Sequence, residues 1–342
     1  MTIPPRPTRV GVVGAGFMGR AYAQIVHDHP LAVLVGIADT DLATGQRAAD
    51  PLGVSAYAET ETLLERERPD GLIIATVEDA HRGPALAAFA RGVGVLIEKP
   101  LATTIADGQA IINAATAAGT LLMVGHILRF DARYALLREE VRSGRLGEPL
   151  TAYARRLNGK SAQARLRGRT SLPLFLGVHD YDMLRWTLGS DVTQVVAQER
   201  RGFLRDQGFD VEDASVALLS FANGVLATVE AGWVLPDGHP SGFDQRLEVN
   251  GTAGRAELVG HYAGLAVITD ERESWPDTAL WPTVHGRVSG ALARQTDHFL
   301  ESIRFGTPPL VTGADGLAAL RIALAVEDSA RSGRAVNLEP IK

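Results

Sequence analysis

Residues 10–19 read VGVVGAGFMG, an apolar run that leads into three closely spaced glycines. A G-x-G-x-x-G pattern between a strand-like run and a helical one is typical of a backbone loop that binds a dinucleotide pyrophosphate. Gly14 is expected to make the turn, and Gly16 to let the backbone approach the phosphates at the helix N-terminus. The alternative is a chance glycine turn in a fold that binds no nucleotide.

An acidic residue at the end of the second strand would complete this pattern. Asp39 follows Gly19 by 20 residues and ends an apolar run, so its carboxylate can accept a hydrogen bond from the ribose 2′-hydroxyl. It would repel a 2′-phosphate, and neither Lys nor Arg stands beside it in the segment Asp39-Thr40-Asp41. The sequence therefore favours NAD over NADP.

The first half of the chain alternates short β-branched runs with helical patterns. The runs lie at residues 10–13, 33–38, 72–75, 93–97 and 121–124. Each is apolar throughout, as expected for parallel strands that helices cover on both faces. This half is predicted to be an α/β Rossmann domain with a doubly wound parallel sheet.

After residue 125 the pattern changes to longer strand candidates between amphipathic segments. Strands are predicted at 150–157, 192–201, 214–221, 225–234 and 247–249, and helices at 132–142, 174–188, 291–305 and 316–331. Asn223-Gly224 predicts a hairpin with a type I′ turn. We therefore expect two domains, residues 1–126 for NAD binding and residues 127–342 for substrate binding and oligomerisation.

Composition narrows the class of protein. The 342 residues include 34 Lys and Arg against 40 Asp and Glu, no Cys, and no apolar run of membrane-spanning length. The sequence has no stripe of basic residues of the kind that binds nucleic acid. A short cluster of Arg165, Arg167 and Arg169 lies either in a solvated loop or in a loop that faces the substrate. A cytoplasmic protein without a cleaved signal peptide, disulfide or thiolate metal site is expected.

Two side chains are candidates for acid–base chemistry. Lys99, in the segment Glu98-Lys99-Pro100, ends the fifth strand at the sheet edge where ligands of open α/β folds bind. His179 lies in a helical segment, and an imidazole is suited to accept a hydroxyl proton near neutral pH. Their plainer interpretations are a solvated lysine and a core or capping histidine. His179, Asp180 and Asp182 cannot converge on a metal ion, so no metal is expected.

The order of these motifs resembles the glucose-fructose oxidoreductase and inositol dehydrogenase (Gfo/Idh/MocA) family over the whole chain. The resemblance rests on residues 14–19, Thr76 and His81, residues 98–100, and His179 with Asp182. It implies a second domain with a large open, mainly antiparallel sheet, commonly used in homodimer or homotetramer contacts. It also implies a catalytic role for Lys99 and His179. The implied NAD-binding residues are Gly14, Gly16, Phe17, Met18, Gly19, Asp39, Thr76, His81, Glu98 and Lys99.

The chain departs from the family pattern at two places. Phe175 stands where the family usually has an aspartate one turn before the histidine, and Val77-Glu78 replaces the usual Pro-Asn. An aromatic ring cannot accept the hydrogen bond of a carboxylate, but it offers a stacking face to a sugar. Asp182 is the nearest alternative carboxylate, and its role is either substrate contact or structure. Arg129 is either a substrate contact or one partner of a structural ion pair.

These residues predict an NAD-dependent dehydrogenase that oxidises a secondary alcohol on a polyhydroxylated ring, or reversibly reduces the corresponding ketone. The ring belongs to a sugar, a cyclitol, or a glycoside such as an aminoglycoside, and the sequence does not choose among them. Arg129, Phe175 and Asp182 are the candidate substrate contacts. The alternatives are an NAD-using glycosidase or eliminating enzyme that returns the hydride, and a non-catalytic regulator that senses NAD or sugar.

Overall fold

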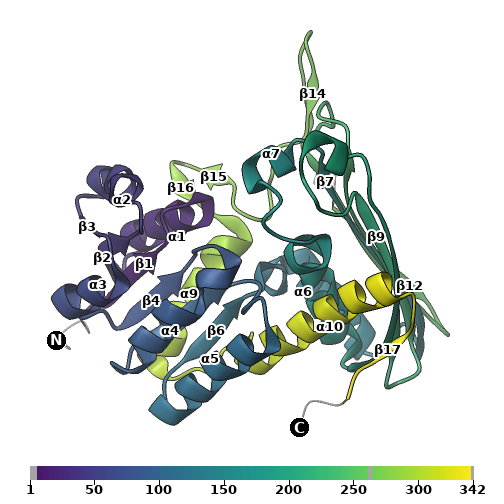
Figure 1. The fold of residues 1–342 in the computed structure, drawn as a ribbon, viewed down its shortest axis with the longest axis horizontal. Helices are drawn as coiled ribbons and strands as arrows, with labels where there is room; N and C mark the ends of the chain where they lie inside the picture. Colours follow the sequence, from purple (N-terminus) through teal and green to yellow (C-terminus); the bar gives the residue numbers. More distant parts are fainter. Residues whose placement is uncertain (1–5, 261–263, 340–342) are drawn as a thin grey trace. The chain divides into compact units, whose positions relative to one another are not determined.

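The structure is a computed structural model that describes residues 6–260 and 264–339. The chain divides into two units (Figure 1). The first comprises Met1–Ile127 and Leu280–Leu317, and the second comprises Leu128–Ala279 and Ala318–Lys342. Among the described residues, no helix is long and apolar enough to cross a membrane.

The first unit contains a six-stranded parallel sheet. Its strands are β1 (Thr8–Val13), β2 (Ala32–Ala38), β3 (Ser55–Tyr57), β4 (Gly71–Ile74), β5 (Gly94–Glu98) and β6 (Leu122–Gly125). The order β3-β2-β1-β4-β5-β6 is that of the dinucleotide-binding Rossmann fold, so the predicted doubly wound sheet is confirmed. Only the short strand β3 has no counterpart among the predicted runs.

Helices cover both faces of this sheet. They are α1 (Phe17–Asp28), α2 (Leu42–Ala49), α3 (Thr60–Glu67), α4 (Arg82–Phe89), α5 (Ile105–Ala118) and α9 (Gly290–Phe305). Gly11 of β1 faces Leu63 of α3, whereas Gly71 of β4 faces Phe299 and Ile303 of α9. Because Gly11 pairs with Leu72, the neighbour of Gly71, these two glycines point to opposite faces. Figure 1 accordingly shows α9, in light green, among the purple and blue elements of this unit.

The position of α9 corrects the predicted domain limits. The expected boundary between residues 126 and 127 lies one residue from the division of the units, but residues 280–317 belong to the first unit instead of the second. The physical reason is that helices must cover both faces of the parallel sheet, since β4 and β5 are buried throughout. The apolar stripe of α9 supplies that cover, with Phe299 and Leu300 buried.

The second unit contains a seven-stranded sheet. Its strands are β7 (Pro149–Gly159), β8 (Val192–Arg200), β9 (Ala214–Phe221), β10 (Leu226–Leu235), β11 (Phe243–Gly251), β12 (Arg255–Val259) and β17 (Val336–Asn337). Their order is β12-β11-β7-β10-β9-β8-β17, and every neighbouring pair except β7 and β10 is antiparallel. Exposed and buried residues alternate along β9, which indicates one packed face and one open face. This confirms the predicted open, mainly antiparallel sheet.

Four helices accompany this sheet. They are α6 (Ala132–Arg142), α7 (Ala162–Leu166), α8 (Val178–Leu188) and α10 (Gly313–Ser332), the last of which begins in the first unit. Two short hairpins, β13 (Val267–Ile268) with β14 (Glu273–Ser274) and β15 (Thr283–Val284) with β16 (Arg287–Val288), were not predicted. Two-residue strands carry too few side chains for an alternating pattern to be recognised.

The hairpin between β9 and β10 forms where predicted, but the predicted type I′ turn is wrong. That turn needs a positive φ at both central residues. Here the φ of Gly224 is 88°, whereas the φ of Asn223 is not positive. The Phe221 amide donates to the carbonyl of Val225 across a longer loop. The side-chain oxygen of Asn223 accepts from the amide of Val225, which accounts for an asparagine at this place.

Candidate active site

The glycine loop has the shape that a pyrophosphate requires. A Cβ on Gly14, whose φ is 93°, would lie 2.5 Å from the carbonyl oxygen of Ala75, and one on Gly19 would lie 1.7 Å from that of Gly14. A Cβ on Gly16 would meet nothing within 4 Å. Two glycines are therefore needed for close backbone packing, while the third leaves open space at the start of α1.

The beginning of α1 is suited to an anion. Gly16 precedes the helix without a side-chain cap, and the first turn of α1 has no acidic residue. Its amides are thus available to phosphate oxygens, and the helix dipole favours negative charge there. Phe17, which follows Gly16 directly, is half exposed, and Met18 is partly buried. The loop fits the dinucleotide that the sequence predicts.

Asp39 lies at the end of β2 and contacts this loop. One carboxylate oxygen accepts from the amide of Ala15 at 2.7 Å, and the other accepts from the amide of Asp41 at 2.9 Å. A carboxylate has about four acceptor positions, so both contacts leave capacity for a ribose hydroxyl. The structure thus shows a supporting role for Asp39 that its position in the sequence did not indicate.

This geometry predicts the outcome of changing Asp39. We expect Asp39→Asn to weaken NAD binding about tenfold and to narrow the preference for NAD over NADP, because the amide removes the charge that repels a 2′-phosphate. The dissociation constants of both cofactors are measured by titration without substrate. Gln46→Asn, on the exposed surface of α2, is the control. An unchanged ratio of the two constants would contradict a role in cofactor choice.

Lys99 follows β5, and a buried chain of hydrogen bonds fixes the residue before it. Glu98 accepts from the hydroxyl of Tyr22 at 2.7 Å and from the backbone amide of Lys99 at 3.1 Å. The side-chain amide of Gln295, on α9, donates to the same tyrosine oxygen at 2.5 Å. Burial raises the pKa of Glu98, an effect that the charge of Lys99 opposes. No motif in the sequence signals Tyr22 or Gln295.

Thr76 and His81 lie in the segment after β4. The Thr76 hydroxyl donates weakly to the carbonyl of Val77, at 3.3 Å. The imidazole of His81 is 1% exposed, and its Nδ1 lies 3.0 Å from the carbonyl oxygen of Pro100. Burial lowers the pKa of His81, so the neutral ring donates this hydrogen bond. His81 therefore connects this segment to the one that carries Lys99.

In the second unit, α8 carries His179 in its first turn. A single π-helical turn, Pro173–Gly177, leads into the helix, and the imidazole of His179 is partly exposed. The two aspartates that follow His179 in α8 differ from it in their burial. Asp180 and Asp182 are fully buried, each with an arginine partner.

Two bidentate ion pairs anchor α8. Asp180 accepts from Nε and Nη2 of Arg156 at 2.8 and 3.0 Å. The same guanidinium donates to the side chain of Gln245 at 2.9 Å and more weakly to Tyr134 at 3.4 Å. This network joins α8 to β7, β11 and α6. Arg156 is in phase with the buried Ala152 and Ala154 of β7, a signal from which an inward-pointing charge could have been predicted.

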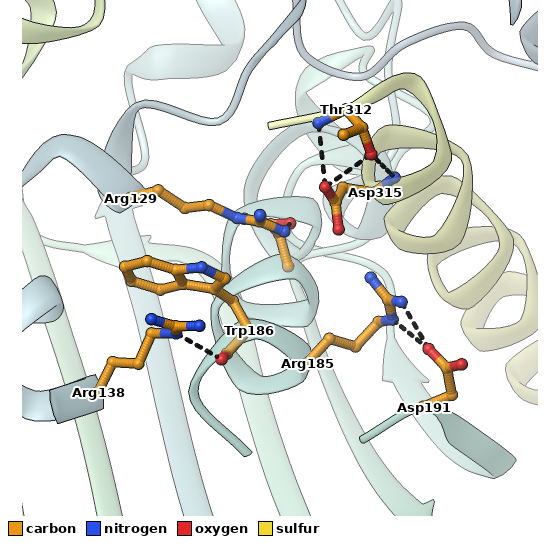
Figure 2. A network of polar contacts seen from close by, with 8 residues as sticks. Arg129, Arg138, Arg185, Trp186, Asp191, Thr312 and Asp315 are labelled. Carbon is orange, nitrogen blue, oxygen red and sulfur yellow. Dashed lines mark hydrogen bonds and ion pairs between the residues drawn. The ribbon is translucent and has the colours of Figure 1, made fainter. Parts of the chain in front are cut away.

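Arg129 and Asp182 form the second pair, which is the structural ion pair that the sequence analysis gave as the alternative to substrate contact. The guanidinium donates from Nε at 2.9 Å and from Nη2 at 2.6 Å, and the two residues are 4% and 0% exposed. Figure 2 shows the indole of Trp186 between the guanidinium groups of Arg129 and Arg138, which lie 5.5 and 4.4 Å from the ring. Each carboxylate oxygen of Asp182 accepts from this arginine, and the burial of both side chains is typical of a structural ion pair.

Phe175 lies in the π-helical turn and packs into a hydrophobic cluster. Its ring centroid is 5.6 Å from that of the buried Trp233, and Leu172 and Leu176 belong to the same cluster. The ring is only partly buried, so a remaining face is available. The position where the family has a carboxylate thus has apolar surroundings here.

Among the described residues, no group of three or more acidic or histidine side chains could hold a metal ion.

Comparisons with known proteins agree with this fold and these motifs. The pattern of the family described as "Oxidoreductase family, NAD-binding Rossmann fold" matches residues 8–126, and that of the "GFO/IDH/MocA C-terminal domain" matches residues 134–257. The chain is 31% identical to "Inositol 2-dehydrogenase 4" of Saccharopolyspora erythraea, over 92% of its own length and 90% of that protein. It is 28% identical to "Myo-inositol 2-dehydrogenase" of Thermotoga maritima, over 97% and 99% of the two chains.

A solved structure shows the same similarity. The crystal structure of a myo-inositol dehydrogenase from Corynebacterium glutamicum superposes with a TM-score of 0.81, at 25% identity over 98% of this chain and all of that one. The chain belongs to the Gfo/Idh/MocA oxidoreductase family. It is an NAD-dependent oxidoreductase, as the glycine loop and Asp39 had indicated.

Proposed function

We propose that this protein is a dehydrogenase that oxidises a secondary alcohol on a sugar or cyclitol ring, including the sugar rings of glycosides and aminoglycosides, or in reverse reduces the corresponding ketone. The observation that carries the proposal is Lys99 at the carboxyl end of β5, in a family member whose relatives are named inositol dehydrogenases. The carboxyl ends of β1 and β5 share one sheet edge, so the lysine and the glycine loop lie at the same edge. Polyhydroxylated small molecules are the proposed substrates.

Lys99 and His179 are the proposed acid–base pair. Bound NAD would supply the hydride acceptor for the carbinol carbon. The Lys99 ammonium donates a hydrogen bond to the reacting oxygen and stabilises the charge that develops on it. An imidazole nitrogen of His179 accepts the hydroxyl proton, which a group of neutral reference pKa does efficiently. Phe175 offers the remaining face of its ring to a sugar, since C–H-rich faces of sugars are apolar.

The remaining residues of the loop and strand ends are proposed to hold NAD. Gly14, Gly16 and Gly19 shape the loop, Asp39 binds the adenosine ribose, and Thr76, His81 and Glu98 form the edge next to Lys99. Phe17 and Met18 begin the helix at the phosphates.

The open face of the second sheet is proposed as the contact surface of a homodimer or homotetramer. Several large apolar side chains on neighbouring strands are exposed there, and such a patch is characteristic of an interface. They are Val196 of β8, Val216 and Leu218 of β9, and Leu226 of β10. Sedimentation measurements on the purified protein test this state.

The test of the reaction is the absorbance of reduced nicotinamide. The protein is mixed with NAD or NADP and a panel of cyclitols, free sugars, glycosides and aminoglycosides, near neutral and at mildly alkaline pH. We expect the absorbance to rise with NAD and one group of substrates. Tight NAD binding with no net reduction across the panel would contradict the proposal, and it would favour internal hydride return or a regulatory protein.

A further inference from the structure

Residues 280–289, here called the return strap, connect the second unit to α9 and lie within the first unit. The strap is an ordered element. The amide of Leu292 donates to the carbonyl of Leu280 at 2.9 Å, and the amide of Ser289 donates to that of Pro282 at 2.8 Å. Between these bonds, β15 and β16 form a hairpin with a tight turn at His285 and Gly286, whose φ angles are 52° and 78°. Two such residues are what a type I′ turn requires.

The strap packs on the helix that begins at the glycine loop. Strand β16 lies against α1, and the ring of Trp281 meets that of Phe17 edge to face, with centroids 5.8 Å apart and planes at 71°. Phe17 is 51% exposed although it has this partner. A large aromatic side chain that stays half exposed contributes little to the core. Phe17 follows Gly16 directly, and a Cβ on that glycine would meet nothing within 4 Å beyond its chain neighbours.

The charge of this region suits a phosphate-containing ligand. Residues 280–296 contain no Asp or Glu, and they include Arg287 and Arg294. In α1, the first acidic residue is Asp28, at the far end of the helix. The strap therefore adds aromatic surface and no negative charge to the start of α1, where the dipole favours an anion.

We propose that the return strap is part of the dinucleotide site, and that Trp281 and Phe17 act as a pair that holds the pyrophosphate-containing part of NAD. Trp281 sets the orientation of Phe17, and the pair closes one side of the space over Gly16. This inference concerns cofactor binding alone, so it does not depend on which alcohol the enzyme oxidises.

The test is NAD binding by the full chain without substrate. Isothermal titration gives the dissociation constants of wild type, Trp281→Ala, Phe17→Ala and the double variant. Each single change is expected to raise the constant about three- to tenfold, because it removes either an aromatic contact of the bound cofactor or the ring that orients this contact. The NAD dissociation constant of the double variant is expected to rise by less than the product of the two single fold-changes, since the two rings act together.

Controls separate binding from folding. Trp275→Ala removes an indole from the second unit, where it bonds Glu273, and should leave NAD affinity within twofold of wild type. Trp281→Phe keeps an aromatic ring and should recover most of the affinity. ADP-ribose, which contains both phosphates, should lose affinity for Trp281→Ala as NAD does, whereas AMP should not. Urea unfolding of each variant without ligand shows whether the fold is retained.

Two outcomes would overturn the inference. One is an NAD dissociation constant for Trp281→Ala within twofold of wild type, in a variant that unfolds at the wild-type urea concentration. The other is an equal loss for AMP and ADP-ribose. Because no substrate is present, a failure here is distinguishable from a failure of the proposed dehydrogenase reaction, which would show intact NAD binding without turnover.

Discussion

Lys99→Met is expected to lower kcat by about 10²- to 10⁴-fold while NAD still binds, because the change removes a positioned hydrogen-bond donor from the reacting oxygen. The methionine keeps the length and packing of the side chain. Backbone contacts of Glu98 and the chain to Tyr22 do not involve the ammonium and should remain. The measurements are the initial rate of nicotinamide reduction and the NAD dissociation constant.

The use of lysine at this place is itself informative. Lys99, Lys160 and Lys342 are the chain's only lysines among 34 basic Lys and Arg residues, so arginine is the usual cation of this protein. A guanidinium is larger and planar, whereas an ammonium is a compact point charge, so an arginine would not place its hydrogen-bond donor at the same point. We therefore expect Lys99→Arg, the charge-matched control, to be nearly as inactive as Lys99→Met. Wild-type turnover by Lys99→Met would disprove a catalytic role.

The parallel sheet was predictable because its information is local. Apolar runs that end in glycine or in a charged residue specify strands and their carboxyl ends, and the glycine spacing specifies the loop. The return of α9 to the first unit was not predictable in this way. Its amphipathic pattern shows that one face is buried, but the pattern does not say against which sheet, and that choice depends on which strand face lacks cover.

The side-chain partners of the candidate site were less predictable than its positions. Arg129 and Asp182 are separated by 53 residues, and only the folded chain shows that they bind each other. Phe175 illustrates the same limit, because the sequence identifies the missing carboxylate but not the cluster around Trp233 that surrounds the ring. Spacing predicts backbone geometry well, whereas a buried ion pair depends on contacts between distant segments.

Arg156→Met is expected to destabilise the second unit by about 3–5 kcal/mol, because it leaves the carboxylate of Asp180 buried without its partner. Asp180 is 0% exposed, and the guanidinium provides both of its hydrogen bonds. Urea unfolding followed by circular dichroism measures the change. Arg331→Met removes an ion pair to Asp328 whose side chains are 76% and 50% exposed, and it should cost less than about 1 kcal/mol.

A double replacement separates the buried charge from the packing of α8. Arg156→Met with Asp180→Leu should recover much of the lost stability, since an apolar pair of similar volume removes the unpaired charge. Recovery will be incomplete because the side-chain oxygen of Gln245 also loses its donor. If the single and double variants have the same free energy of unfolding, the unpaired carboxylate of Asp180 is not the cause of the destabilisation. Even when stability returns, kcat should stay below wild type, because the ion pair that fixes α8, and with it the imidazole of His179, is gone.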